Sequence, residues 1–234
     1  LSQVIEEPDE VKVSSPVLKT NGSGDRFVEF NYYKQYLHYK TLGFRTQARQ
    51  HLQQFIASFA SFAEKELWTH EFLETEEYES RLNIIRYELY EQVVFPVLLS
   101  GYQKRDPWSV LWLARTANNF YKVKHLHKQI DFKTDYGLLK ECYLLAPNNN
   151  EVHKDLLSVQ IRALQYCIHE YPTGILYGAV NGATIDECQE ILSEVEFARK
   201  LDIDKIQEKF LNDCQSKVLE YIVRLQTYKY QGGQ

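Results

Sequence analysis

Ionisable side chains near the end of the sequence are the first groups whose chemistry could support a reaction. His169 and Glu170 precede the segment PTGILYGAVNG, and Asp186 and Glu187 follow it. A histidine beside carboxylates can transfer protons as a general acid or base. Thr184 and Glu187, however, match a helix capping box, and a histidine at a helix C-terminus interacts favourably with the helix dipole. We therefore expect structural roles for these residues.

A metal site is the second candidate, because His125 and His127 form an HxH pair. His153 and His169 lie well apart from this pair, on one predicted helix. Zinc sites usually take their ligands from short, regular spacings such as HExxH or CxxC, and the sequence contains neither. We expect surface histidines, with no bound metal and no cofactor.

The stretch RTQARQH contains the third candidate, the pair Arg45 and His51. An arginine followed by a histidine at this spacing resembles the loose signature of HEPN ribonucleases, an all-helical family. The resemblance implies that Arg45 and His51 would act on an RNA phosphodiester. Thr46 stands where that family usually has an asparagine. On a helix the two side chains would lie about 120° apart at the edges of the apolar face, where solvated residues also lie, so the ribonuclease is an alternative function.

Other common catalytic signatures are missing from the sequence. It contains no GxGxxG or GxxxxGK[ST] loop for phosphates and no GxSxG nucleophile elbow. The sequence therefore lacks the motifs by which most nucleotide-dependent enzymes and hydrolases are usually indicated. We expect a non-catalytic protein.

Aromatic residues are concentrated in the stretch FVEFNYYKQYLHYK. Its tyrosines, Tyr32, Tyr33, Tyr36 and Tyr39, occupy positions all round a predicted helix, so they cannot all face one core. Tyrosine is enriched at protein interfaces, where its ring buries area and its hydroxyl finds a partner. We expect these tyrosines to form a protein-binding surface, unless other helices cover this one completely.

Composition and charge narrow the class of partner. The chain has 234 residues, 44% hydrophobic and 25% charged, with a formal net charge of −5. An acidic balance disfavours nucleic-acid binding and suits a basic protein partner, which an immunity or antitoxin protein would neutralise. A structural homodimer is a further alternative. No segment is apolar for long enough to predict a membrane span.

The cysteines indicate the cellular compartment in which the protein works. Cys142, Cys167, Cys188 and Cys214 are widely spaced and lie among apolar residues in predicted helices. Such cysteines usually pack as small hydrophobic residues, and disulfides would be unusual in a chain with so large a core. We expect reduced thiols and a cytoplasmic location.

The pattern from Phe27 onwards is helical and predicts an all-α fold of eight or nine helices. They would form an antiparallel bundle or an irregular stacked array of helix pairs. The stretch LLKECYLLAPNNNEVHKDLL resembles the join between tetratricopeptide repeats, although no 34-residue period recurs, so a short solenoid of that kind is an alternative. Residues 1–26 read as a flexible or docked arm, and 27–234 as one domain with possible halves 27–130 and 131–234.

Local signals predict particular helix features. The apolar series from Ala48 through Phe59 to Phe62 predicts one buried helix face. Pro96 lies inside a helical pattern and predicts a kink or a break before it. Asp106 followed by Pro107 predicts a helix start. A last apolar series predicts a seam on the final helix: Ile203, Phe210, Cys214, Tyr221 and Leu225.

Overall fold

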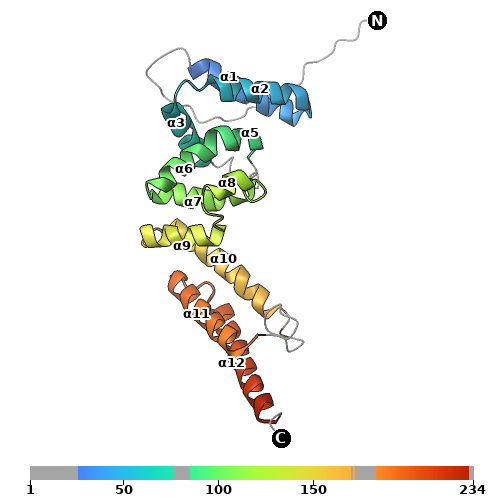
Figure 1. The fold of residues 1–234 in the computed structure, drawn as a ribbon, viewed down its shortest axis with the longest axis vertical. Coiled ribbons are helices and arrows are strands. Elements are labelled where there is room, and N and C mark those ends of the chain that lie inside the picture. The colour runs from blue at the N-terminus through green and yellow to red at the C-terminus, as the bar shows by residue number, and fades with distance from the viewer. Residues whose placement is uncertain (1–25, 76–84, 170, 172–182, 232–234) are drawn as a thin grey trace, which may run out of the picture. The chain divides into compact units, whose positions relative to one another are not determined.

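The computed structural model describes residues 26–75, 85–169, 171 and 183–231, and every regular element in these ranges is a helix (Figure 1). The predicted all-α fold is therefore confirmed. The chain divides into two compact units, Leu1–Phe59 and Ala60–Gln234. The expected arm, apart from Arg26, and the connector 172–182 with its three glycines lie outside the described residues. A boundary near residue 130 stays a prediction.

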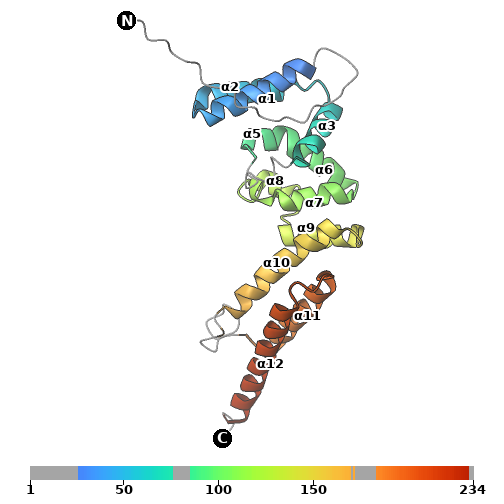
Figure 2. The ribbon, with the colours of Figure 1, turned by 180° about the vertical axis from the view of Figure 1, so that it is seen from behind.

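Two helices make up the described part of the first unit. Helices α1 (Arg26–Thr41) and α2 (Arg45–Ser58) lie side by side, as the two opposite views in Figures 1 and 2 show. Gly43 joins them with φ +78°, a left-handed conformation that glycine adopts without strain. The Phe44 N–H bonds the Tyr39 carbonyl at 2.9 Å and closes the turn. Gly43 thus lies just past a helix end, as the sequence predicts.

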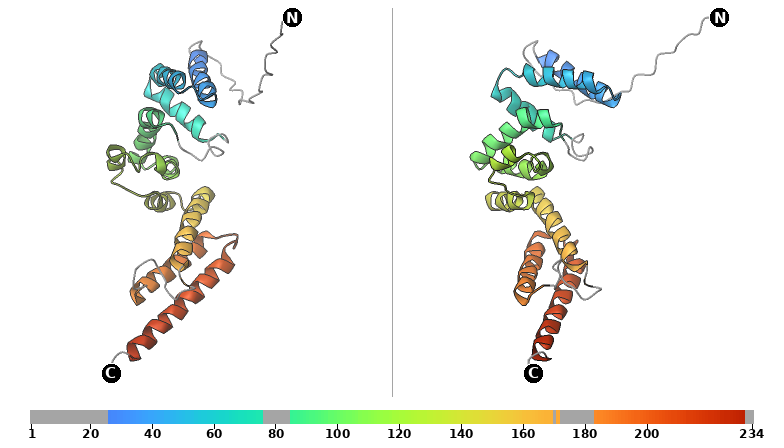
Figure 3. Two further views of the ribbon diagram at one scale, coloured as in Figure 1. Left: turned by 90° about the vertical axis from the view of Figure 1, so that its right-hand side faces the viewer. Right: turned by 45° about the vertical axis from the view of Figure 1, so that its right-hand side comes forward.

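The second unit contains the remaining helices. In chain order they are α3 (Phe62–Leu73), α5 (Tyr87–Leu89), the π-helical turn η1 (Tyr90–Val94), α6 (Phe95–Gln103), α7 (Pro107–Arg115), the 3-10 turn η2 (Ala117–Asn119), α8 (Lys124–Lys128), α9 (Asp135–Leu145), α10 (Asn150–Ile168), α11 (Ile185–Leu201) and α12 (Glu208–Gln231). Helices close in the sequence pack together: α6 on α7, α7 on α9, α9 on α10, α10 on α11 and α11 on α12 (Figure 3). Both expected arrangements, a helical bundle and a stacked helix array, agree with this packing.

The helix break between Ser58 and Phe62 corrects one prediction. The expected single helix ends at Ser58, and Phe59 takes an extended conformation. Ser61 then caps α3 by accepting the Glu64 N–H at 3.2 Å, while the Glu64 carboxylate accepts the Ala60 N–H at 2.7 Å. These reciprocal bonds satisfy the free N–H groups of a new helix start. Phe62 consequently does not continue the buried face and is 45% exposed.

The helix around Pro96 is distorted as predicted. The N–H of Phe95 bonds the Tyr90 carbonyl five residues back, which makes η1 a π-helical turn between α5 and α6. Proline supplies no N–H to the carbonyl four residues before it, and its ring crowds that carbonyl. The widened turn just before Pro96 accommodates both effects, because π-turns are a common site of helix distortion.

The predicted helix starts are also present. The Asp106 carboxylate accepts the Ser109 N–H at 3.0 Å, with Pro107 as the first residue of α7. At α11, the Thr184 hydroxyl accepts the Glu187 N–H at 3.3 Å and the Glu187 carboxylate accepts the Thr184 N–H at 2.7 Å. Both caps form from residues within one helical turn, so the local sequence specifies them completely.

Helices α10, α11 and α12 share a core in the second unit. Cys188, Val195, Leu211 and Cys214 are fully buried in it. The predicted seam of α12 is only partly right, because Ile203 lies before the helix and is 66% exposed. All four cysteines are free; Cys142 is also buried, and Cys167 is half-buried. This burial agrees with the expectation that the cysteines pack as small hydrophobic residues.

Candidate functional site

The predicted ribonuclease pair lies on α2. Arg45 is the first residue of the helix and is exposed. The His51 ring stacks on the Tyr39 ring, with centroids 5.1 Å apart and planes 1° from parallel, and its second neighbour is Tyr32 at 6.4 Å. Its Nδ1 is buried and has no hydrogen-bond partner among the described residues. The imidazole is therefore held as a packing group between α1 and α2.

The four predicted tyrosines do not share one environment. Tyr36 is 5% exposed, and Tyr33 packs on the Phe55 ring at 5.0 Å, so these two side chains help to join α1 and α2. Tyr32 and Tyr39 are half-buried beside His51. A partner could reach parts of Tyr32 and Tyr39, whereas Tyr36 belongs to the interior of the first unit.

The histidine candidates have separate partners. His125 Nε2 lies 2.8 Å from the Glu91 carboxylate, while His127 Nε2 lies 2.9 Å from the Lys133 carbonyl. The His169 ring contacts the Tyr166 carbonyl at 2.6 Å. Across the part of the chain that the structure describes, no three His, Cys, Asp or Glu side chains are grouped to hold a metal ion.

A groove in the second unit is the site that sequence reasoning missed. It has a volume of about 530 Å³ and lies between α7, α9 and α10. Its base includes the buried side chains of Trp112 and Leu139. The groove also has a polar lining, which consists of Arg115, Asn118, Asp135, Glu151, Asp155, Ser158 and Arg162.

Hydrogen bonds join Arg115 to two carboxylates in the lining of this groove. Arg115 Nε donates to Asp155 at 2.6 Å, and a terminal nitrogen donates to Glu151 at 2.9 Å. The guanidinium also lies 5.0 Å from the Trp112 ring. Burial alone would lower the pKa of Arg115, but the two carboxylates outweigh it and raise that pKa. The hydrogen bond from Arg115 in turn lowers the pKa of Glu151, so this carboxylate is ionised at neutral pH.

Asp135, at the start of α9, also lines the groove. Its Oδ1 accepts the Tyr121 hydroxyl at 2.8 Å and the Tyr136 N–H at 2.9 Å. The Tyr136 hydroxyl lies 2.8 Å from Gln160 and 2.9 Å from Glu194. These bonds tie α9 to α10 and α11, and they fix the position of Asp135 in the groove.

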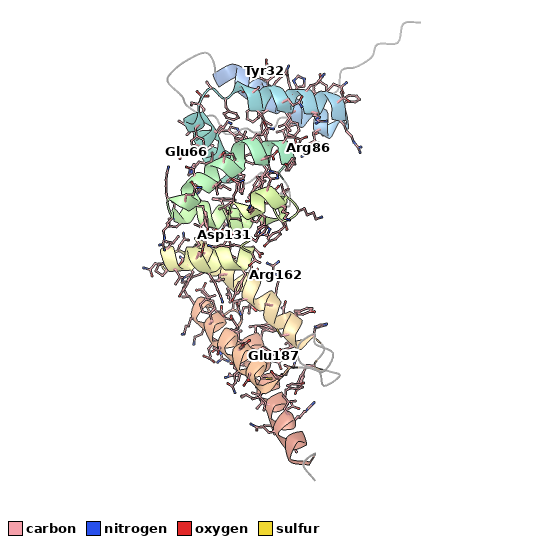
Figure 4. The ribbon with its side chains drawn as sticks, in the orientation of Figure 1. Tyr32, Glu66, Arg86, Asp131, Arg162 and Glu187 are labelled. Carbon is pink, nitrogen blue, oxygen red and sulfur yellow. The ribbon has the colours of Figure 1, made fainter. Side chains whose placement is uncertain are left out.

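Helix α10 gives the groove its length. Its contributions lie on one face, from Glu151 in the first turn to Arg162, which Figure 4 labels. At 1.5 Å per residue these two residues are about 16 Å apart along the helix axis, a span that fits about five residues of extended chain.

The polar stripe on α10 is the sequence signal that could have indicated this groove. Glu151, Asp155, Ser158 and Arg162 recur at helical spacing. A polar stripe on a helix usually faces solvent, and only the positions of α7 and α9 turn this one into a concave surface.

The apolar character of the helices bears on membrane association, and similarity to known proteins bears on the family of the chain. Within the described ranges, none of the helices combines the length and apolar character that crossing a bilayer requires. The chain has no significant match to any protein-family model, to any curated protein or to any solved structure.

Proposed function

We propose that this chain is a non-catalytic protein-binding module that holds a short basic segment of a partner protein in the groove between α7, α9 and α10. The observation that supports it is the charge of the groove. Three carboxylates, Asp135, Glu151 and Asp155, line it together with two guanidinium groups. Arg115 is neutralised by its own carboxylate partners, and the lining as a whole keeps an excess of one negative charge.

The accessibility of the carboxylates supports the same proposal. The Glu151 side chain is 56% exposed and that of Asp155 is 29% exposed, whereas that of Arg115 is only 21% exposed. A basic side chain from a partner therefore meets the carboxylates first. Charge complementarity of this kind steers encounter and selects partners. The formal net charge of the whole chain, −5, also attracts a basic partner.

The hydrogen bonding of the groove favours binding over catalysis. A general acid or base needs a pKa near the working pH and a position from which it can reach a substrate proton. Glu151 instead has a lowered pKa because Arg115 donates to it. The Asp155 carboxylate also accepts from Arg115. Groups held in this way suit a fixed recognition surface.

A titration with model peptides tests the proposal. The probe is a fluorescent hexapeptide of alternating arginine and serine, with a glutamate–serine peptide as its charge control. We expect the full chain to bind the basic peptide and not the acidic one. Fluorescence anisotropy at low and high salt should show weaker binding as ions screen the charges.

Three variants connect that binding to the groove. Glu151→Gln should weaken it by about two- to fivefold, the effect of an exposed ion pair worth up to about 1 kcal/mol. Arg162→Ala should strengthen it, because a like charge is removed. Glu208→Gln is the matched control, since Glu208 is 57% exposed, pairs with a lysine three residues away and lies on α12. Equal affinity in all three variants, or no binding of the basic peptide, would refute the proposal.

The alternative functions predict other results. A HEPN-like ribonuclease would need Arg45 and His51 for RNA cleavage, and a structural homodimer would show twice the chain mass in light scattering. Neutralisation of a basic partner, as by an immunity or antitoxin protein, remains a specific form of our proposal. Co-purification from the native host would identify that partner. We also expect the protein to be cytoplasmic.

A further inference from the structure

The two arginines that line the groove differ in their pairing. Arg115 donates to Asp155 at 2.6 Å and to Glu151 at 2.9 Å, so its charge is already compensated within the chain. Arg162 is exposed on α10, and it takes part in none of the ion pairs or hydrogen bonds among the residues that the structure describes. The groove therefore contains a cation that a bound ligand could compensate.

The neighbours of Arg162 offer it no acidic partner. Helical side chains three or four residues apart can pair, and these positions around Arg162 hold Ser158, Val159, Gln165 and Tyr166. Asp135, the remaining carboxylate of the lining, accepts hydrogen bonds from Tyr121 and Tyr136 instead. Within the described part of the chain, the guanidinium of Arg162 thus keeps its planar set of donors, which matches the two oxygens of a carboxylate.

The charge changes sign along the face of α10 that lines the groove. Glu151 and Asp155 belong to the first turns of the helix, and Arg162 follows further along it. At 1.5 Å per residue, Arg162 lies about 16 Å from Glu151 and about 10 Å from Asp155 along the helix axis. At 3.6 residues per turn, the three positions fall within about 40° of one another around that axis. One segment that follows α10 can therefore reach all three.

These distances define a spacing for an extended segment. Each residue of an extended chain advances about 3.3 Å, and successive side chains point to opposite sides. Two side chains that face α10 together are therefore an even number of residues apart. Four residues span about 13 Å, a length between the two distances along α10, whereas a spacing of three or five would turn one side chain away from the helix.

We infer that Arg162 binds an acidic side chain of the same partner segment whose basic residue meets Glu151 and Asp155. The inference rests on the proposed function and adds to it the chemistry of the partner, namely a basic and an acidic residue four positions apart in an extended segment. The opposite placement on α10 would bring like charges together. The groove would thus also select the direction in which the segment binds.

A second series of peptides tests this inference. The arginine–serine hexapeptide is lengthened with serines at either end, and the added part carries a glutamate three, four or five residues from the nearest arginine. Each of these peptides has a match with glutamine in place of the glutamate. We expect at least one peptide with the spacing of four to bind the full chain about two- to fivefold more tightly than its match, the effect of an exposed ion pair.

The sign of this effect separates a specific contact from general attraction. Glutamate lowers the positive charge of the peptide, and the protein itself has a formal net charge of −5. General attraction alone therefore predicts that every glutamate peptide binds more weakly than its glutamine match. Tighter binding requires a cation at the place where the glutamate lies.

Variants of the chain assign that cation to Arg162. Arg162→Ala should abolish the preference for glutamate while the parent hexapeptide still binds, and Arg162→Glu should prefer a lysine at the same place in the peptide. Lys209→Ala is the matched control, because it removes one positive charge from an exposed position on α12, outside the groove lining. The preference for glutamate should persist in this control.

The outcomes separate the two proposals. Binding of the parent hexapeptide without a preference for glutamate at the spacing of four refutes the role of Arg162 and leaves the groove in place. A preference that survives in Arg162→Ala refutes this role as well. Failure of the parent hexapeptide to bind overturns the proposed function and with it the inferred chemistry of the partner.

Discussion

The ammonium group of Lys65 on α3 donates a hydrogen bond of 3.0 Å to the backbone carbonyl of Gln92. Gln92 lies four residues before Pro96, so its carbonyl is the one to which an ordinary helix would bring the N–H of residue 96. Proline has no N–H, and the lysine donates in its place. A distant side chain thus completes a helix that proline interrupts.

The first prediction concerns this bond. Lys65→Met should lower the free energy of unfolding by about 1 kcal/mol, the net value of one hydrogen bond from a partly exposed group. Denaturant titration followed by circular dichroism measures the change.

A double-mutant cycle with Pro96→Ala shows whether the bond acts as described. Alanine restores the missing N–H, so the cost of Lys65→Met should become smaller in that background. The same cost in both backgrounds would show that Lys65 stabilises the chain by another route.

The second prediction concerns the close approach of α6 and α7. A Cβ on Gly101 would lie 1.9 Å from Ser109 Oγ and 2.6 Å from Ser109 Cβ. Rotation of the serine hydroxyl removes only the first clash, so Gly101→Ala must separate the helices. We expect a loss of about 2–3 kcal/mol in thermal or chemical unfolding, as for other overpacked cores.

Gly137→Ala is the control for that variant. A Cβ there would lie 3.5 Å from its nearest neighbour, Thr134 Oγ1, which is an ordinary contact. Gly137 lies in α9, where alanine is the better helix former, so stability should hold or rise slightly. Ser109→Gly combined with Gly101→Ala should recover part of the loss, and an unimpaired Gly101→Ala protein would contradict the packing.

The third prediction concerns pH. The Thr184 N–H and hydroxyl, which bond the Glu187 carboxylate, lower the pKa of Glu187 below its ordinary value of 4.5. A carboxyl group whose pKa is lower in the folded chain adds stability above its ordinary pKa and loses that stability as pH falls through the folded pKa. The contribution of Glu187 should therefore be complete at pH 7, start to fall near pH 4.5 and be lost as the pH drops through the lowered pKa.

Glu187→Gln tests this dependence. At pH 7 it should lower the melting temperature by about 1–2 °C, because an amide oxygen can still accept the Thr184 N–H but the charge that strengthens this bond and favours the helix N-terminus is lost. The difference from the parent protein should shrink as the pH falls below 4.5, the ordinary pKa of the group. Glu190→Gln, at an exposed position on the same helix, should leave the melting temperature almost unchanged. A pH-independent difference would mean that ionised Glu187 is not the source.

The fourth prediction concerns the ribonuclease alternative. His51→Ala removes a ring that stacks on Tyr39, so we expect a loss of about 1 kcal/mol in unfolding experiments and no change in RNA cleavage. A fluorescent single-stranded RNA provides the cleavage assay. Cleavage by the parent protein that disappears in both Arg45→Ala and His51→Ala would favour the ribonuclease over the binding module.

Sequence patterns predicted the features that depend on neighbouring residues. Asp106 caps α7, Thr184 and Glu187 form their capping box, and the helix distorts before Pro96. Each of these depends on backbone groups within one or two helical turns, where the order of residues fixes which atoms can meet. The all-α fold class follows from the helical periodicity of apolar residues, which recurs along the chain.

Sequence reasoning fell short at one helix end and at one tyrosine. Periodicity extended one helix from Ala48 to Phe62 and passed over a local signal, because Ser61 and Glu64 are three residues apart and make the short-range bonds that start a new helix there. The environment of Tyr36 depended on tertiary contacts instead. Its position in the sequence allowed an exposed or a buried side chain, and the packing of α1 on α2 buries it.

The order of amino acids by itself determined that this protein is helical, where several of its helices begin and that its charge is acidic. Tertiary structure alone decided which polar residues gather in one place. Arg115, Asp135 and Asp155 come from three different helices, and their spacing in the sequence carries no sign of a shared groove. The physical reason is that helix packing depends on many weak side-chain contacts at once, whereas a cap or a proline acts through a few adjacent atoms.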